Sequence, residues 1–99
     1  MVNNFIHKKI KIGRKHVDAF LIKLQAKNFI TLVGKNGYIM CGYLNLKIAN
    51  KFKDVAIKVV GISTIEEMLK AKMHSCSNAA KKLGINKYRS VKDILRIIA

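Results

Sequence analysis

The hydrophobic period of this chain changes after Gly42, and that change constrains the fold more than any other feature of the sequence. Before Gly42, apolar residues recur at every second position, as over 5–12, or fill short β-branched and aromatic runs. These runs predict strands over 5–12, 17–24, 28–33 and 38–43. Because both parities are apolar over 17–24, we expect that strand to be central in the sheet or covered on both faces.

The chain contains no proline, so glycine and asparagine mark the predicted turns and helix ends. The segment Gly-Lys-Asn-Gly at 34–37 tolerates positive φ and predicts a hairpin turn. After Gly42, four apolar residues recur with the spacing of one helix face, and Asn45 stands where it would cap that helix. These residues are Leu44, Ile48, Ala49 and Phe52. A predicted strand over 55–60 follows, so the helix would cross over between two strands of one sheet.

Three helix starts follow in the last third of the chain. Thr64 precedes Glu67 at the spacing of a capping box. Ser77 opens a short helix that Gly84 closes, and Ser90 opens a third helix with an apolar stripe. Together these patterns predict a single α+β domain over 1–99. It would have a mainly antiparallel sheet of about five strands, one crossover helix and two to three short C-terminal helices.

The chain is strongly basic: 20 Lys and Arg residues against 5 Asp and Glu residues give a formal net charge of +15. Such a charge attracts polyanions, nucleic acid among them, at low salt. No basic run is longer than two residues, so lysines dispersed over a solvated surface explain the charge better than a dedicated nucleic-acid surface. The densest basic segment comprises Lys81, Lys82, Lys87, Arg89, Lys92 and Arg96.

Residues 79–85, followed by a helix from Ser90, are similar to the first half of a helix-turn-helix. The second helix argues against that motif, because its apolar residues leave chiefly Lys92, Asp93 and Arg96 to reach bases. We therefore expect this helix to dock on the sheet. Nucleic-acid binding through the basic segment is the alternative function.

No apolar stretch approaches the roughly 20 residues that a membrane-spanning helix needs. The chain reaches Lys8 and Lys9 without an apolar export signal, so we expect a cytoplasmic protein without a membrane partner. In that compartment we expect Cys41 and Cys76 to be free thiols and not a disulfide.

Residues for catalysis are scarce. The adjacent acids Glu66 and Glu67 fit the start of a helix better than a pair of catalytic carboxylates. His74 and Cys76 form the one close pair of metal-ligating types, so we predict neither metal nor cofactor. Cys76 stands just before a helix start, where a thiol can be activated, although a buried inert thiol is the simpler interpretation. A small enzyme with a site near the 61–64 turn is the third hypothesis.

The stretch Asn-Gly-Tyr-Ile-Met-Cys-Gly at 36–42 resembles the YunC-like family, a domain of unknown function found in bacteria and archaea. Segments 60–69 and 80–85 agree with the family's pattern, so the resemblance covers nearly the full chain. The resemblance implies a small α+β fold and no established activity. Asn45 stands where the family usually has aspartate, and Ser63 stands where arginine is common. Any site formed by those two positions in relatives is altered here.

The leading hypothesis is a small basic domain that self-associates and binds a ligand or partner. Several strands are apolar on both faces, and few helices are available to cover them. We expect a homo-oligomer, with a pocket or interface at the fourth strand and the 61–64 turn. Whether the protein is an enzyme stays open. The candidate residues are Tyr38, Met40, Cys41, Asn45, Ser63, Thr64 and Glu66.

Overall fold

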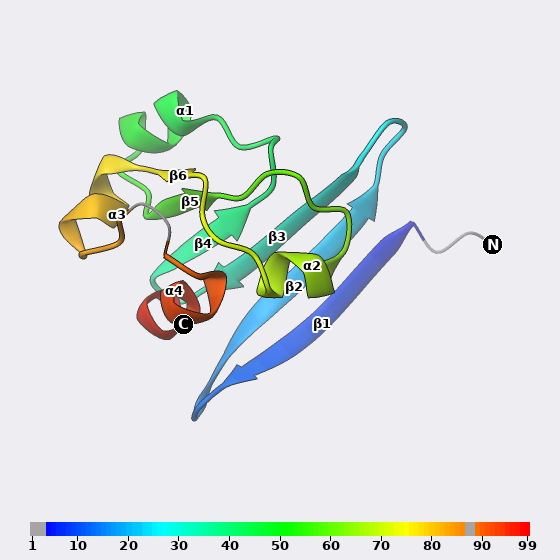
Figure 1. Cartoon of the computed structure of the whole chain (residues 1–99), viewed down its shortest axis with the longest axis horizontal. Coiled ribbons are helices and arrows are strands. Elements are labelled where there is room, and N and C mark those ends of the chain that lie inside the picture. The colour runs from blue at the N-terminus through cyan, green and yellow to red at the C-terminus, as the bar shows by residue number, and fades with distance from the viewer. Residues whose placement is uncertain (1–3, 87–88) are drawn as a thin grey trace.

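The computed structural model describes residues 4–86 and 89–99, and within them six strands form one sheet. The strands are β1 (Phe5–Ile12), β2 (Lys15–Lys23), β3 (Asn28–Gly34), β4 (Gly37–Met40), β5 (Ala56–Lys58) and β6 (Ser75–Cys76). The helices are α1 (Leu46–Lys51), α2 (Ile65–Leu69), α3 (Asn78–Lys82) and α4 (Val91–Ile98). Figure 1 shows the strands side by side in chain order, with α2 over β2. None of the helices in these described residues is long and apolar enough to span a membrane.

The sheet is mixed. β1 to β4 form an antiparallel meander, whereas β4 and β5 run parallel and are joined through α1. β5 and β6 are again antiparallel. The predicted α+β fold with one crossover helix is therefore confirmed, while the prediction of about five strands omits β6. That strand has only two residues, and so short a segment has no hydrophobic period.

One face of the sheet, the core face, carries the main hydrophobic core. On β2 its residues are Val17, Ala19 and Leu21, and all three are buried. Leu21 pairs with Ile30 of β3, and Ala19 pairs with Leu32. α2 and α4 cover this face over β2 and β3, and α3 packs on it next to β5. Each large apolar side chain fully buried there contributes about 1.5–3 kcal/mol.

α4 docks on the core face through the apolar stripe predicted from the sequence, and its C-terminal end is held by the β3–β4 turn. The backbone N–H of Asn36 in that turn donates to Ile98 O at 2.8 Å. A Cβ added to Gly34 would lie 2.2 Å from Ile98 O. The glycine therefore serves the docking of α4 as well as the hairpin. The buried residues of the stripe are Val91, Ile94, Leu95 and Ile98.

The opposite face, the outer face, is covered only in part. α1 packs on it over β4 and β5, where Leu44, Ala49 and Ala56 are buried. The helices that contact β2 and β3 lie on the core face, so Phe20 and Ile22 are only half-buried on the outer side. Of the two alternatives predicted for this strand, the central position is confirmed, because β2 pairs with both β1 and β3. Coverage on both faces is not found, because α1 lies over β4 and β5.

The predicted buried face of the crossover helix is also wrong at two positions. Ile48 is 53% exposed and Phe52 is 68% exposed, while Ala49 is buried. α1 has six residues, fewer than two turns, so one side chain of the helix is buried. The fourth strand ends at Met40, earlier than predicted, and Leu44 reaches the core from the loop before the helix.

Candidate functional site

The loops that follow β4 and β5 diverge to opposite sides of the sheet. The two strands are parallel, so their carboxyl ends lie at the same end of the sheet. The chain leaves β4 toward α1 on the outer face and leaves β5 toward α2 on the core face. In open sheets with parallel strands, such a divergence opens a crevice outside the carboxyl ends, and ligands commonly bind there.

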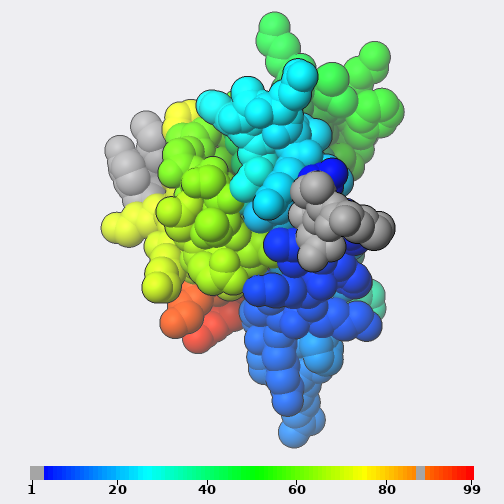
Figure 2. Space-filling model, turned by 90° about the vertical axis from the view of Figure 1, so that its right-hand side faces the viewer, coloured from blue at the N-terminus to red at the C-terminus, as the bar shows by residue number. Residues whose placement is uncertain are grey.

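A groove of about 790 Å³ occupies this position. It lies between the loops after the two strands and the β2–β3 turn, which Figure 2 shows together in green, yellow-green and cyan. The volume is within the range of small-molecule sites, about 300–1,000 Å³. The walls of the groove are Ala26, Lys27, Asn28, Cys41, Gly42, Tyr43, Val59, Val60, Gly61, Ile62 and Ser63.

Hydrogen bonds tie the walls of the groove together. Asn28 Nδ2 donates to Ser63 O at 2.9 Å and joins the start of β3 to the loop after β5. Cys41 N donates to Ile30 O at 3.0 Å, and Ile30 N donates to Cys41 Sγ at 3.4 Å. Because the Cys41 side chain is buried and its sulfur accepts this bond, the residue acts as part of the wall.

Gly61 turns the chain from the end of β5 toward α2. Its φ is 76°, in the left-handed region that favours glycine. Nothing lies within 4 Å of the point that a Cβ would occupy, so backbone conformation and not space calls for glycine here. The turn sends the following residues to the core face and so forms one wall of the groove.

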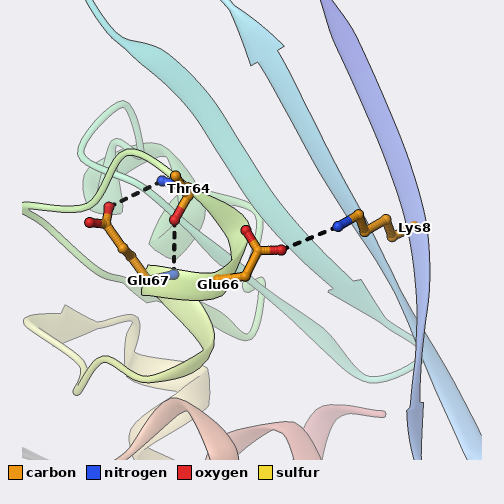
Figure 3. Close-up of polar contacts among 4 residues, drawn as sticks. All are labelled: Lys8, Thr64, Glu66 and Glu67. Atoms are coloured by element: carbon orange, nitrogen blue, oxygen red, sulfur yellow. Dashed lines mark hydrogen bonds and ion pairs between the residues drawn. The ribbon is translucent and has the colours of Figure 1, made fainter.

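α2 begins with the predicted capping box. Thr64 Oγ1 accepts from Glu67 N at 3.0 Å, and Glu67 Oε1 accepts from Thr64 N at 3.2 Å (Figure 3). The same carboxylate oxygen accepts from Ser63 N at 2.7 Å and from Ser63 Oγ at 3.2 Å. These bonds, the one from Ser63 N foremost, lower the pKa of Glu67. The ionised carboxylate thus fixes the loop beside the groove and is poorly suited to donate a proton.

Glu66 points toward β1, where its carboxylate pairs with Lys8 Nζ at 3.2 Å (Figure 3). Its own backbone N–H, and then Lys8, lower the pKa of Glu66. Both adjacent acids lie in the first turn of α2, which confirms the prediction that they belong to a helix start. Their carboxylates are engaged separately, so they do not form an acid–base pair.

The family model described as a domain of unknown function, DUF1805, matches residues 40–98. The chain belongs to this family. The uncharacterized protein YunC of Bacillus subtilis is 39% identical over 80 residues, which are 77% of this chain and 79% of that protein. A crystal structure of a protein of unknown function from Thermoplasma acidophilum is 34% identical and has a TM-score of 0.92, covering 96% of this chain and 93% of that chain. The YunC-like resemblance is confirmed, and the range matched by the family model contains both loops that form the groove.

Only some of the residues predicted to form a site in this DUF1805 member lie at the groove. Cys41 and Ser63 lie in its walls, and Thr64 and Glu66 follow at the start of α2. The other three predicted residues belong to the outer layer of the fold, around α1. They are Tyr38, Met40 and Asn45.

Each of these three residues has a structural partner of its own. The hydroxyl of Tyr38, beside a smaller hollow, donates to Asp54 Oδ2 at 2.9 Å. Burial first, and then the bond and charge of that carboxylate, raise the pKa of Tyr38 to about 12. Asn45 caps α1 as predicted, and Met40 packs beneath that helix. Asn45 and Ser63, where the chain departs from the family pattern, therefore do not share a wall of the groove.

Five groove residues lie outside the predicted fourth strand and the 61–64 turn, where the site was expected: Ala26, Lys27, Asn28, Val59 and Val60. No motif marks them, because they are distant in sequence and meet only through the order of the strands. One feature of the sequence could have located part of the groove. A crossover helix implies parallel strands, and the carboxyl ends of two such strands would have pointed to 41–43 and 59–63.

The basic segment lies on α3, on α4 and in the loop between them. α4 is docked on the core face by its apolar side, so it is not a helix free to enter the major groove of DNA. Arg89 is half-buried, and Lys87 lies outside the described residues. The exposed members of the segment are Lys81, Lys82, Lys92 and Arg96.

Both cysteines are free and buried, as predicted. Burial raises the pKa of Cys76, and the nearby charge of Lys81 lowers it by less. Its Sγ donates to Ile85 O at 3.7 Å, so the helix start at Ser77 does not turn this thiol into a nucleophile. Within the residues that the structure describes, no three His, Cys, Asp or Glu side chains form a group that could hold a metal ion.

Proposed function

We propose that this DUF1805 member is a small-molecule-binding domain whose ligand occupies the groove. The observation that carries the proposal is the divergence of the two loops after the parallel strands β4 and β5. This divergence leaves a hollow of about 790 Å³ at the end of the sheet where ligands bind in α/β proteins. The hydrogen bonds among the walls support a groove that is formed before the ligand arrives.

The walls favour a small organic anion with an apolar body. Tyr43, Val60 and Ile62 give the groove an apolar surface, and Lys27 is the one charged residue in its described walls. The formal net charge of +15 adds a positive field around the site. Asn28 and Ser63 add polar groups that can orient the ligand.

Anilinonaphthalene sulfonate has this chemistry, and its fluorescence rises in an apolar site. We expect saturable binding of one dye molecule to the groove. Val60→Trp should weaken binding by about tenfold or more, a loss of about 1.4 kcal/mol, because the larger ring fills the space the dye needs. Lys27→Gln should weaken it less and should reduce its salt dependence. A fluorescence titration measures all three affinities.

Two variants serve as matched controls. Phe52→Trp adds a ring at an exposed position on α1, outside the groove, and should bind the dye as the unmodified chain does. Phe5→Ala removes an exposed ring from β1 and tests whether the dye sits on the outer face instead. Unchanged binding by Val60→Trp, or loss of binding in Phe5→Ala alone, would contradict a ligand in the groove.

Self-association is the alternative that we keep for the open outer face of β1 to β3, because this face carries half-buried and exposed apolar residues. Light scattering coupled to size exclusion tests it, and a monodisperse monomer at micromolar concentration would contradict it. The proposal includes a cytoplasmic location and a single domain over 1–99. An enzyme at the 61–64 turn has less support, because Ser63, Thr64 and Glu67 are engaged with one another in the capping box.

A further inference from the structure

We propose that the outer face of β1, β2 and β3 binds single-stranded nucleic acid. This surface adjoins the groove at Tyr43, and the inference does not depend on a ligand in the groove. Antiparallel pairing puts Phe5 opposite Ile22 and His7 opposite Phe20, on the side of the sheet away from α2 and α4. Phe29 of β3 pairs with Ile22 on the same side.

Aromatic rings gather on this face. The rings of His7 and Phe20 are stacked, with centroids 4.6 Å apart and 8° between their planes. The ring of Phe5 lies 6.1 Å from that of Phe20, and Phe5 is 56% exposed. A second pair, Phe29 and Tyr43 with centroids 6.1 Å apart, extends the aromatic surface toward the rim of the groove. Exposed rings on a sheet offer platforms on which unpaired bases stack.

The charge on the same face matches a polyanion. Lys9 and Lys11 follow the aromatic residues along β1 at every second position, and they pair with Asp18 and His16 of β2. The acid among them, Asp18, is already in contact with His7 at 2.9 Å. A polyanion is attracted by a chain of formal charge +15, whereas a second copy carries the same charge and is repelled.

The rings also select the form of the nucleic acid. In a duplex the base faces are stacked on one another and are closed to protein side chains, so platforms of this kind suit a single strand. The lysines would then follow the phosphates beside the rings. The outer face joins the two features that non-specific single-strand binding needs, aromatic platforms and a basic track.

Fluorescence anisotropy with a labelled oligothymidine of about 15 nucleotides tests the proposal directly. Phe5→Ala should weaken binding about five- to a hundredfold, the loss expected for one stacked base. A duplex of the same length should bind more weakly and should be insensitive to this change. Leu83→Ala, at an exposed apolar residue next to α3, is the matched control and should bind as the unmodified chain does.

A charge-matched pair of double variants locates the phosphate contacts. Lys9→Gln with Lys11→Gln, and Lys81→Gln with Lys82→Gln, each remove the same formal charge. The first pair should reduce the slope of log affinity against log salt by about 1.4, since each contact on a single strand adds about 0.7. The second pair should leave the slope nearly unchanged.

Four results would overturn the proposal. Equal losses in the two double variants would mean binding through overall charge, and a larger loss in the second would assign the nucleic acid to the basic segment. A dimer in light scattering that Phe5→Ala converts to a monomer would assign the outer face to a second copy of the chain. Absence of saturable binding at low salt would also reject it.

Discussion

The two faces of the sheet are covered very differently, and the contrast is sharpest within β2. Val17, Ala19 and Leu21 are buried beneath the helices of the core face, whereas Phe20 and Ile22 remain half-buried on the outer face. The strand is apolar at both parities, so its own sequence does not decide which face is closed. The placement of α2 and α4 on one side decides it.

This asymmetry separates stability from binding. The core face takes three of the helices and most of the large buried side chains, so it contributes most of the hydrophobic stabilisation. On the outer face α1 covers β4 and β5, and the aromatic residues of β1 to β3 stay partly exposed. The groove lies where the chain passes from one face to the other.

Truncating a side chain should cost much more unfolding free energy on the core face than on the outer face. Ile94→Ala removes a fully buried side chain of α4 and should lower the free energy of unfolding by about 2–5 kcal/mol. Phe20→Ala, on the half-buried face of β2, should lower it by on the order of 1 kcal/mol, since less of the ring leaves water on folding. Urea denaturation measures both. Similar losses would mean that the outer face is covered in solution.

The next largest loss of unfolding free energy is expected where the β3–β4 turn contacts the C-terminal end of α4. Gly34→Ala brings a Cβ to within 2.2 Å of Ile98 O, a backbone atom, and should cost about 1–3 kcal/mol of unfolding free energy. Gly42→Ala is the control, because its Cβ would lie 4.0 Å from the nearest heavy atom, Val60 Cγ1. We expect a change there within about 0.5 kcal/mol. If denaturation finds Gly34→Ala as stable as the control, α4 is not held by this turn.

Removing the helix caps should lower the free energy of unfolding by smaller amounts, and the loss should differ between the two faces. Thr64→Ala removes the capping box of α2, which buries Ile65 and Met68, and should cost about 1 kcal/mol. Asn45→Ala removes the cap of α1, which buries only Ala49 and can unfold locally at little cost to the core. Chemical denaturation of both variants checks the order. A larger loss for Asn45→Ala would make α1 part of the stabilising layer.

Tyr38 makes stability depend on pH only in alkali. Burial beside Asp54 raises its pKa from 10.0 to about 12, so the unfolded chain loses the hydroxyl proton first as pH rises. The stability that the neutral hydroxyl provides is fully present below pH 10 and is lost between pH 10 and 12. Denaturation across this window should show a steeper fall for the unmodified chain than for Tyr38→Phe. A titration of Tyr38 near pH 10 would contradict the buried contact with Asp54.

Much of the fold could be predicted because local patterns produce it. The alternation over 5–12, the Gly-Lys-Asn-Gly turn and the capping box at Thr64 each fix a short element through its own backbone and side chains. The stripe after Ser90 identified the docked face of α4, because a helix so amphipathic must bury one side.

The remaining features depend on how the elements are arranged. Phe52 has the spacing of a buried helix residue and is nevertheless exposed, because α1 is too short to bring it to the sheet. β6 exists only as the partner of β5, at Cys76 and Ser75. The groove joins Asn28, Cys41 and residues 59–63 through strand order, so only the segments at Cys41 and Ser63 could be predicted as parts of a site.

Hydroxyl-radical footprinting of the free chain at micromolar concentration measures whether the outer face is open to solvent. Rates normalised to the urea-unfolded chain should show Phe5 reacting nearly as fast as when unfolded, while Ile94 and Leu95 are strongly protected. Protection of Phe5 equal to that of Ile94 would contradict an open outer face, since this face would then be covered.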